Sequence, residues 1–127
     1  MTTLGREDIL GKSDIPFQAV DIPEWGGTVN VRCMTGRQRW DWDALMYRIN
    51  NGEKVPNILA QVAAWTLCDA SGTRLFRDTD ADKLGDLNGS ALDRIRDVAL
   101  YLSGVTGDAR ERAEGNSNET KPDSGTS

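Results

Sequence analysis

The sequence predicts an α+β domain, predominantly α-helical, in which one N-terminal two-stranded β-hairpin packs with four or five helices and a disordered C-terminal tail follows. Three observations carry this prediction. Only residues 17–33 alternate polar and apolar side chains with a period of two, which is typical of strands. Three later segments repeat apolar residues at helical spacing. From Gly104 onward the composition turns to Gly, Ser, Thr, Asn and charged residues.

The predicted hairpin pairs residues 18–22 with residues 28–33. Gly26 and Gly27 lie between these runs, and glycine adopts positive φ without a Cβ penalty. Trp25 precedes the two glycines at the expected tip. Its indole is either exposed, as an anchor for a partner, or folded back over the helices, and the sequence favours neither. A short helix over residues 3–10 is expected before the hairpin.

A helix over about residues 36–50 should follow the hairpin. Thr35 and Gln38 fit a capping box, in which each side chain satisfies a free backbone amide of the other residue. One apolar face has the spacing i, i+3, i+4, i+7 and consists of Trp42, Leu45, Met46 and Ile49. Trp40 lies on another face, so it is either at the core edge or exposed.

Three further helices are expected. Residues 57–68 are apolar nearly all round, which is typical of a central helix. Thr79 with Asp82 predicts the cap of a short helix through Leu87, and Ser90 predicts the cap of a final helix. The residues expected to be buried together are Trp42, Leu45, Ile49, Ile58, Val62, Trp65, Leu92, Ile95, Val98 and Leu102.

Residues 1–103 therefore read as one globular domain and residues 104–127 as a flexible polar tail. A segment with so few apolar side chains buries too little surface to offset the entropy lost on ordering.

The charge balance argues against a nucleic-acid partner. The chain has 15 Lys and Arg against 20 Asp and Glu, a net charge of −5, whereas phosphate binding calls for a basic patch. Arg32, Arg37 and Arg39 are close in sequence, but a solvated helix start is the favoured interpretation.

No membrane partner is expected either. No apolar run approaches the ~20 residues that cross a bilayer, and the first residues are polar and acidic, unlike a signal peptide. A reducing cytoplasm, with free thiols at Cys33 and Cys68, is the expected location.

The residues of common catalytic and metal sites are missing. The chain has no histidine, which removes the commonest general base and metal ligand. Residues 78–82 open like a calcium loop, but Lys83 and Gly89 stand where such a loop needs Gly and Glu. We therefore expect no enzyme, no metal and no cofactor, and we interpret the acidic run as helix capping and solvated charge.

Several segments together resemble a known family. They are residues 4–10 (LGREDIL), 22–32 (IPEWGGTVNVR), 34–39 (MTGRQR), 67–76 (LCDASGTRLF) and 114–117 (EGNS). The set is similar to the tail assembly chaperones of long-tailed, siphovirus-type bacteriophages and prophages, over about residues 4–118. The resemblance implies a small, mostly helical protein of the host bacterial cytoplasm. Such proteins bind the tape measure protein, keep it soluble while tail tube subunits polymerise around it, and are absent from the mature virion.

This resemblance fits the interpretation from the residues. A chain without recognisable catalytic residues is expected to act by binding another protein. The expected mode is a helix of one protein lying in a groove of the other. Trp25, Gly26, Gly27 and Trp40 are the predicted partner-binding residues. The tail tube protein and a second copy of the chain are further expected partners. The alternative is a structural adaptor of the tail or neck that stays in the phage particle.

Overall fold

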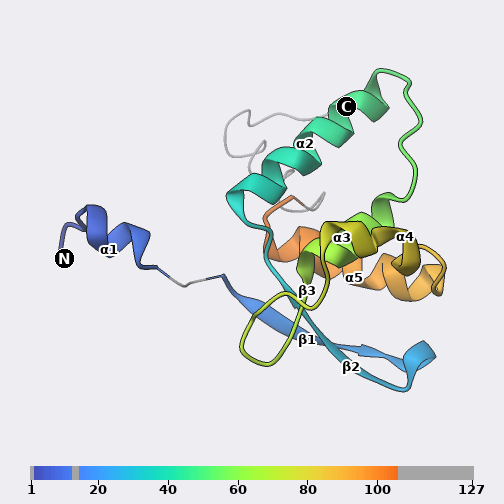
Figure 1. The fold of residues 1–127 in the computed structure, drawn as a ribbon, viewed down its shortest axis with the longest axis horizontal. Coiled ribbons are helices and arrows are strands. Elements are labelled where there is room, and N and C mark those ends of the chain that lie inside the picture. The colour runs from blue at the N-terminus through green and yellow to red at the C-terminus, as the bar shows by residue number, and fades with distance from the viewer. Residues whose placement is uncertain (1, 13–14, 106–127) are drawn as a thin grey trace, which may run out of the picture.

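The structure, a computed structural model, describes residues 2–12 and 15–105, and it confirms a predominantly helical α+β fold (Figure 1). In chain order the elements are α1 (Arg6–Leu10), β1 (Phe17–Ile22), the 3₁₀ turn η1 (Pro23–Trp25), β2 (Gly27–Arg32), α2 (Gly36–Asn50), α3 (Ile58–Thr66), β3 (Leu67–Cys68), the 3₁₀ turn η2 (Asp78–Asp80), α4 (Ala81–Leu84) and α5 (Gly89–Leu102). Most of the predicted tail, residues 106–127, lies outside the described residues, so the tail stays a prediction.

The sheet has three antiparallel strands, not the two that the alternation predicted. β1 pairs with β2 from Phe17↔Arg32 to Ile22↔Gly27, which confirms the hairpin. β3 joins the other edge of β2 through Val31↔Leu67. The helix expected to reach residue 68 ends at Thr66, where Leu67 turns to extended backbone. A two-residue strand is too short to show a period of two, so only its partner β2 reveals it.

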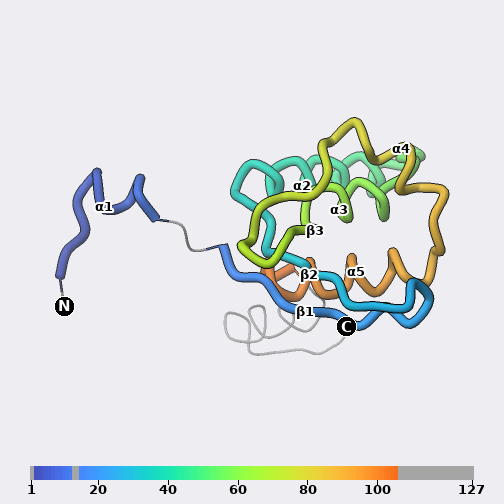
Figure 2. Tube along the Cα trace, turned by 60° about the horizontal axis from the view of Figure 1, so that its bottom comes forward, coloured from blue at the N-terminus to red at the C-terminus, as the bar shows by residue number. Residues whose placement is uncertain are grey.

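The helices form layers with the sheet. α5 packs against α3 and against both hairpin strands. Figure 2 shows α5 beside the β1–β2 hairpin, with α2, α3 and α4 in the layer above. The core lies where these elements meet: Ile22, Val31, Val62 and Ile95 are all fully buried there. The sheet thus supplies core residues that the sequence prediction left out.

Nine of the ten predicted core residues are buried or half-buried, among them Trp42, Trp65 and Ile95. Ile49 is the exception, because 37% of its surface is exposed. It lies in the last turn of α2, from which the chain loops outward (Figure 1). Helical spacing placed Ile49 on the correct stripe, but no described element covers that end of the stripe.

The cap of α2 is as predicted. Thr35 Oγ1 accepts a hydrogen bond from Gln38 N at 3.2 Å, and Gln38 Oε1 accepts one from Thr35 N at 3.0 Å. These two bonds satisfy two of the amides that a helix start leaves free.

The predicted caps of the later helices are wrong by two residues. Asn88 Oδ1, not Ser90, accepts from Ala91 N at 2.9 Å and caps α5. Where Thr79 and Asp82 were expected, Asp80 Oδ2 accepts from Arg77 N at 2.8 Å at the start of η2, and α4 itself begins after Asp80 with no side-chain cap from the described residues. In α5 the cap is the last residue with extended backbone, and Asn88 holds that position because the helix already begins at Gly89.

Candidate partner-binding surface

The outer face of α2 carries the most exposed aromatic side chains of the described residues. Trp40 is 74% exposed and Tyr47 is 71% exposed. With the exposed Ala44 between them, they follow the spacing i, i+4, i+7 and share one helix face. We call these three residues the α2 aromatic row. Trp42 lies buried on the opposite face, so α2 meets the core on one side and solvent on the other.

The hairpin turn is held down on α5. Arg94 Nη1 and Nη2 donate to the two carboxylate oxygens of Glu24 at 2.8 and 2.9 Å. These hydrogen bonds lower the pKa of Glu24 to about 2. Trp25, the next residue, is half-buried and packs against the core. Its indole therefore folds back, which was one of the two alternatives that the sequence left open.

The predicted site residues do not form one surface. Gly26 has a φ of 70°, which glycine tolerates, whereas Gly27 begins β2 without a positive φ. The hairpin turn, which holds Trp25, and the N-terminal part of α2, which holds Trp40, lie at different ends of the domain (Figure 1). Of the four residues, Trp40 is the one whose large apolar side chain is free to meet a partner. Whether any of them binds a partner stays a prediction.

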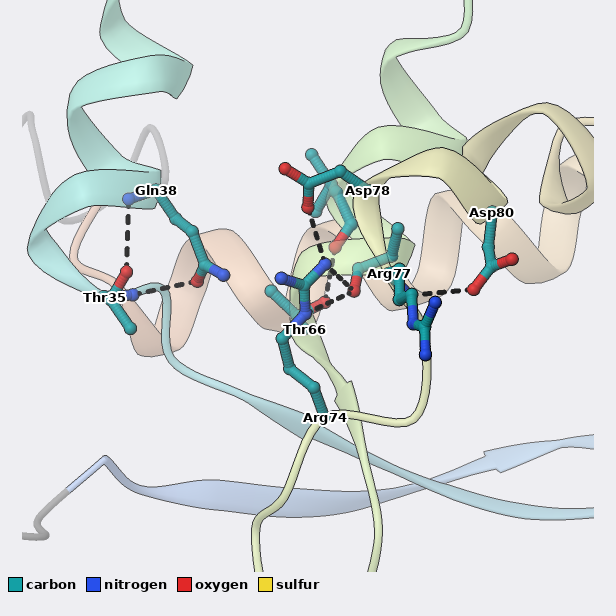
Figure 3. Close-up of polar contacts among 9 residues, drawn as sticks. Thr35, Gln38, Thr66, Arg74, Arg77, Asp78 and Asp80 are labelled. Carbon is teal, nitrogen blue, oxygen red and sulfur yellow. Dashed lines mark hydrogen bonds and ion pairs between the residues drawn. The ribbon is translucent and has the colours of Figure 1, made fainter.

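A polar cavity of about 550 Å³ opens beside the N-terminal end of α2. Its lining residues are Arg32, Thr35, Arg37, Gln38, Asp41, Trp65, Arg74 and Asp78. Figure 3 shows Thr35 and Gln38 on one side and Arg74 with Asp78 on the other. Arg74 donates through Nε and Nη2 to Ala64 O at 3.1 and 2.9 Å, and through Nη2 to Asp78 Oδ1 at 2.7 Å.

This cavity changes the interpretation of the arginine cluster. Of the three arginines noted in the sequence, Arg32 and Arg37 line the cavity, while Arg39 Nη1 donates to Ser103 O at 2.9 Å. Arg74 joins the first two from a distant part of the chain. Sequence spacing gave no signal for Arg74, because the fold alone brings it to α2.

A second hollow of about 530 Å³ is apolar and lies near α4. Leu75, Phe76, Leu84 and Leu87 line it, with Asp80 and Lys83 at its polar positions. Leu75 and Leu87 are exposed. Sequence analysis missed this hollow because Leu75 and Leu87 come from separate segments that only the tertiary fold brings together.

The described residues hold no group of three or more His, Cys, Asp or Glu side chains arranged to bind a metal ion. Within the same part of the chain, no helix has the length and apolar character needed to cross a membrane. Cys33 is half-buried, Cys68 is buried, and both are free thiols.

Comparison with known proteins points to one family. The family model described as phage tail assembly chaperone matches residues 12–118. Among solved structures, the chain is similar to the tail assembly chaperone of bacteriophage HK97, with a TM-score of 0.55 and 19% sequence identity over 76% of this chain and 90% of that chain. A likeness at this identity shows a shared fold. No curated protein matches the chain.

Proposed function

This chain belongs to the phage tail assembly chaperone family, and from that premise we propose that it binds the tape measure protein through the outer face of α2. It holds this client soluble in the host bacterial cytoplasm while the tail tube polymerises, and it leaves before the virion is complete. Its role is binding without catalysis. The tail tube protein and a second copy of the chain are further proposed partners.

The exposure of the α2 aromatic row is the observation that carries this proposal. Large aromatic side chains are enriched among the residues that dominate binding energy, because they bury much area and lose little conformational entropy. Trp40 and Tyr47 stand seven residues apart, two turns along one helix face. A helical segment of the client lying along α2 would cover both, with Ala44 allowing close approach between them.

The acidic surface supports the same proposal. A net charge of −5 keeps a protein with exposed aromatic residues soluble and complements basic stretches of a client. Close to the row itself, Asp43 pairs with Arg39 at 3.5 Å and Arg48 with Glu53 at 2.9 Å. These pairs frame the apolar row with charge of both signs, as at the polar rim of an interface.

Co-expression with the tape measure protein tests the proposal. Wild type should raise the soluble fraction of the client, and Trp40→Ala and Tyr47→Ala should each lower it. Tyr101→Ala is the matched control, because Tyr101 is an aromatic residue 61% exposed on α5. A client that stays equally soluble with all three variants would overturn the assignment of α2, and a wild type without effect would overturn the chaperone role.

Trp25→Ala separates the hairpin from α2 in the same assay. Because Trp25 is half-buried against the core, its loss should act mainly through stability and not through client binding.

Mass spectrometry of purified virions tests whether the chain leaves before the particle is complete. Stoichiometric copies of the chain in virions would instead indicate a structural adaptor.

A further inference from the structure

We propose that the polar cavity beside α2 binds the carboxylate of an acidic side chain on the client. The inference rests on the proposed function, since the cavity borders the α2 aromatic row. Arg37 and Asp41 line the cavity one turn apart, and they are the i−3 neighbours of Trp40 and Ala44 on the helix surface. A client helix lying along the row thus passes the cavity mouth.

The cavity lining holds hydrogen-bond donors for which the described residues provide no acceptor. Gln38 is only 8% exposed. Its Oε1 accepts from Thr35 N at 3.0 Å, whereas its Nε2 donates to no atom of the described residues. Figure 3 shows this amide nitrogen on the side of Gln38 that faces Arg74. This nitrogen is not among the fully buried polar atoms that lack a partner, so it is open to the cavity, and an acceptor brought by a ligand can take its hydrogen bond there.

Two guanidinium groups add charge to the same place. Arg37 forms no ion pair or hydrogen bond with any described residue, and Arg32 uses only Nη1, which donates to Gly72 O at 3.2 Å. The Nε of Arg32 is buried without a partner. Arginine forks match the geometry of a carboxylate and bind it through charge-assisted hydrogen bonds.

The charge count favours a carboxylate over a phosphate. Arg74 is already paired with Asp78 at 2.7 Å. Arg32, Arg37 and Asp41 are the other charged residues of the lining, which leaves about one uncompensated positive charge there. One carboxylate neutralises that charge. A phosphate or a nucleic-acid backbone would bring excess negative charge towards Asp41 and Asp78.

Side-chain amide resonances of Gln38 give a direct test on the full chain. Acetate, titrated against chloride at equal ionic strength, should shift the Nε2 resonances saturably. Arg37→Gln should weaken this binding about tenfold, because it removes one charge-assisted contact. Arg77→Gln, the matched control, removes the same charge from an exposed residue outside the cavity lining and should leave the acetate response unchanged.

Three results of the titration would overturn the proposal: a response that does not saturate, equal responses of the two variants, or inorganic phosphate binding more tightly than acetate. In co-expression, Arg37→Gln should lower the soluble client where Arg77→Gln does not. Equal client solubility with Arg37→Gln and wild type would show that the client does not supply the carboxylate. A wild type that fails to solubilise the client at all would refute the proposed function, while the acetate titration would still decide on the cavity.

Discussion

Helices α2 and α5 are nearly equal in length, at 15 and 14 residues, and each is capped by a side chain. In the sequence both carry an apolar stripe at helical spacing. In the structure they differ sharply. α5 buries four apolar residues, Ala91, Leu92, Ile95 and Ala99, whereas α2 buries only Trp42 and the polar Gln38.

The difference comes from what surrounds each helix. α5 packs against α3 on one side and the hairpin strands on another, so most of its circumference is covered. α2 stands at the outer edge of the helices (Figure 1) and meets the core on one face. An apolar stripe thus identifies a helix that packs on the core, but it does not tell how much of the helix surface stays exposed. In this domain α5 holds the fold and α2 presents a surface.

Truncating α5 should produce the largest loss of stability. Ile95 is fully buried in the middle of its stripe, so Ile95→Ala should lower the free energy of unfolding by about 2–5 kcal/mol. Urea denaturation measures this loss. Tyr101→Ala on the exposed face of α5 should change it by less than about 0.5 kcal/mol. A similarly small effect of Ile95→Ala would mean that α5 is not the helix that holds the core.

Removing the two helix caps tests whether α2 and α5 unfold together. Thr35→Ala and Asn88→Ala each delete a side-chain acceptor and should cost about 1 kcal/mol of helix stability. We expect Asn88→Ala to lower global stability, because α5 belongs to the core. Thr35→Ala should mainly speed amide hydrogen exchange within α2. If Thr35→Ala instead raised exchange equally in α5, the two helices would form one cooperative unit.

The α2 aromatic row should matter little for folding. Trp40→Ala should change the free energy of unfolding by less than about 0.5 kcal/mol, the usual range for exposed sites. Thermal unfolding followed by circular dichroism measures this change. A loss as large as that of Ile95→Ala would show that Trp40 packs within the domain, and it would remove the main argument for a binding face on α2.

The ion pair of Glu24 and Arg94 ties the hairpin turn to α5. Removing it should lower the free energy of unfolding least among these changes, and the loss should depend on pH. The hydrogen bonds from Arg94 lower the pKa of Glu24 from 4.5 to about 2. The folded state therefore favours the charged carboxylate, and this stabilisation is fully present above pH 4.5 and disappears as the pH falls towards 2. Glu24→Gln should be less stable than wild type at neutral pH. This difference in stability should disappear as the pH falls from 4.5 towards 2. A difference that is independent of pH would contradict the role of the charge.

Local patterns in the sequence were sufficient for much of the fold. The alternation of residues 17–33 predicted the hairpin, Thr35 with Gln38 predicted the cap of α2, and the apolar circumference of residues 57–68 predicted that α3 is central. In each case the signal lies in the order and spacing of residues along a short segment, which reflect the geometry of the helix or strand that the segment forms.

Contacts between distant segments required the tertiary structure. Pairing with β2 alone makes Leu67 and Cys68 a strand, packing against the core turns Trp25 inward, and Arg74 reaches α2 only through the fold. The exposure of Ile49 and Trp40 likewise depends on which elements cover α2. Sequence period gives the face on which a side chain lies, but burial and cavities depend on how separate segments meet. The sequence by itself therefore determined the hairpin and the main helices of this protein, whereas the tertiary structure decided the third strand and which surfaces of the helices remain exposed.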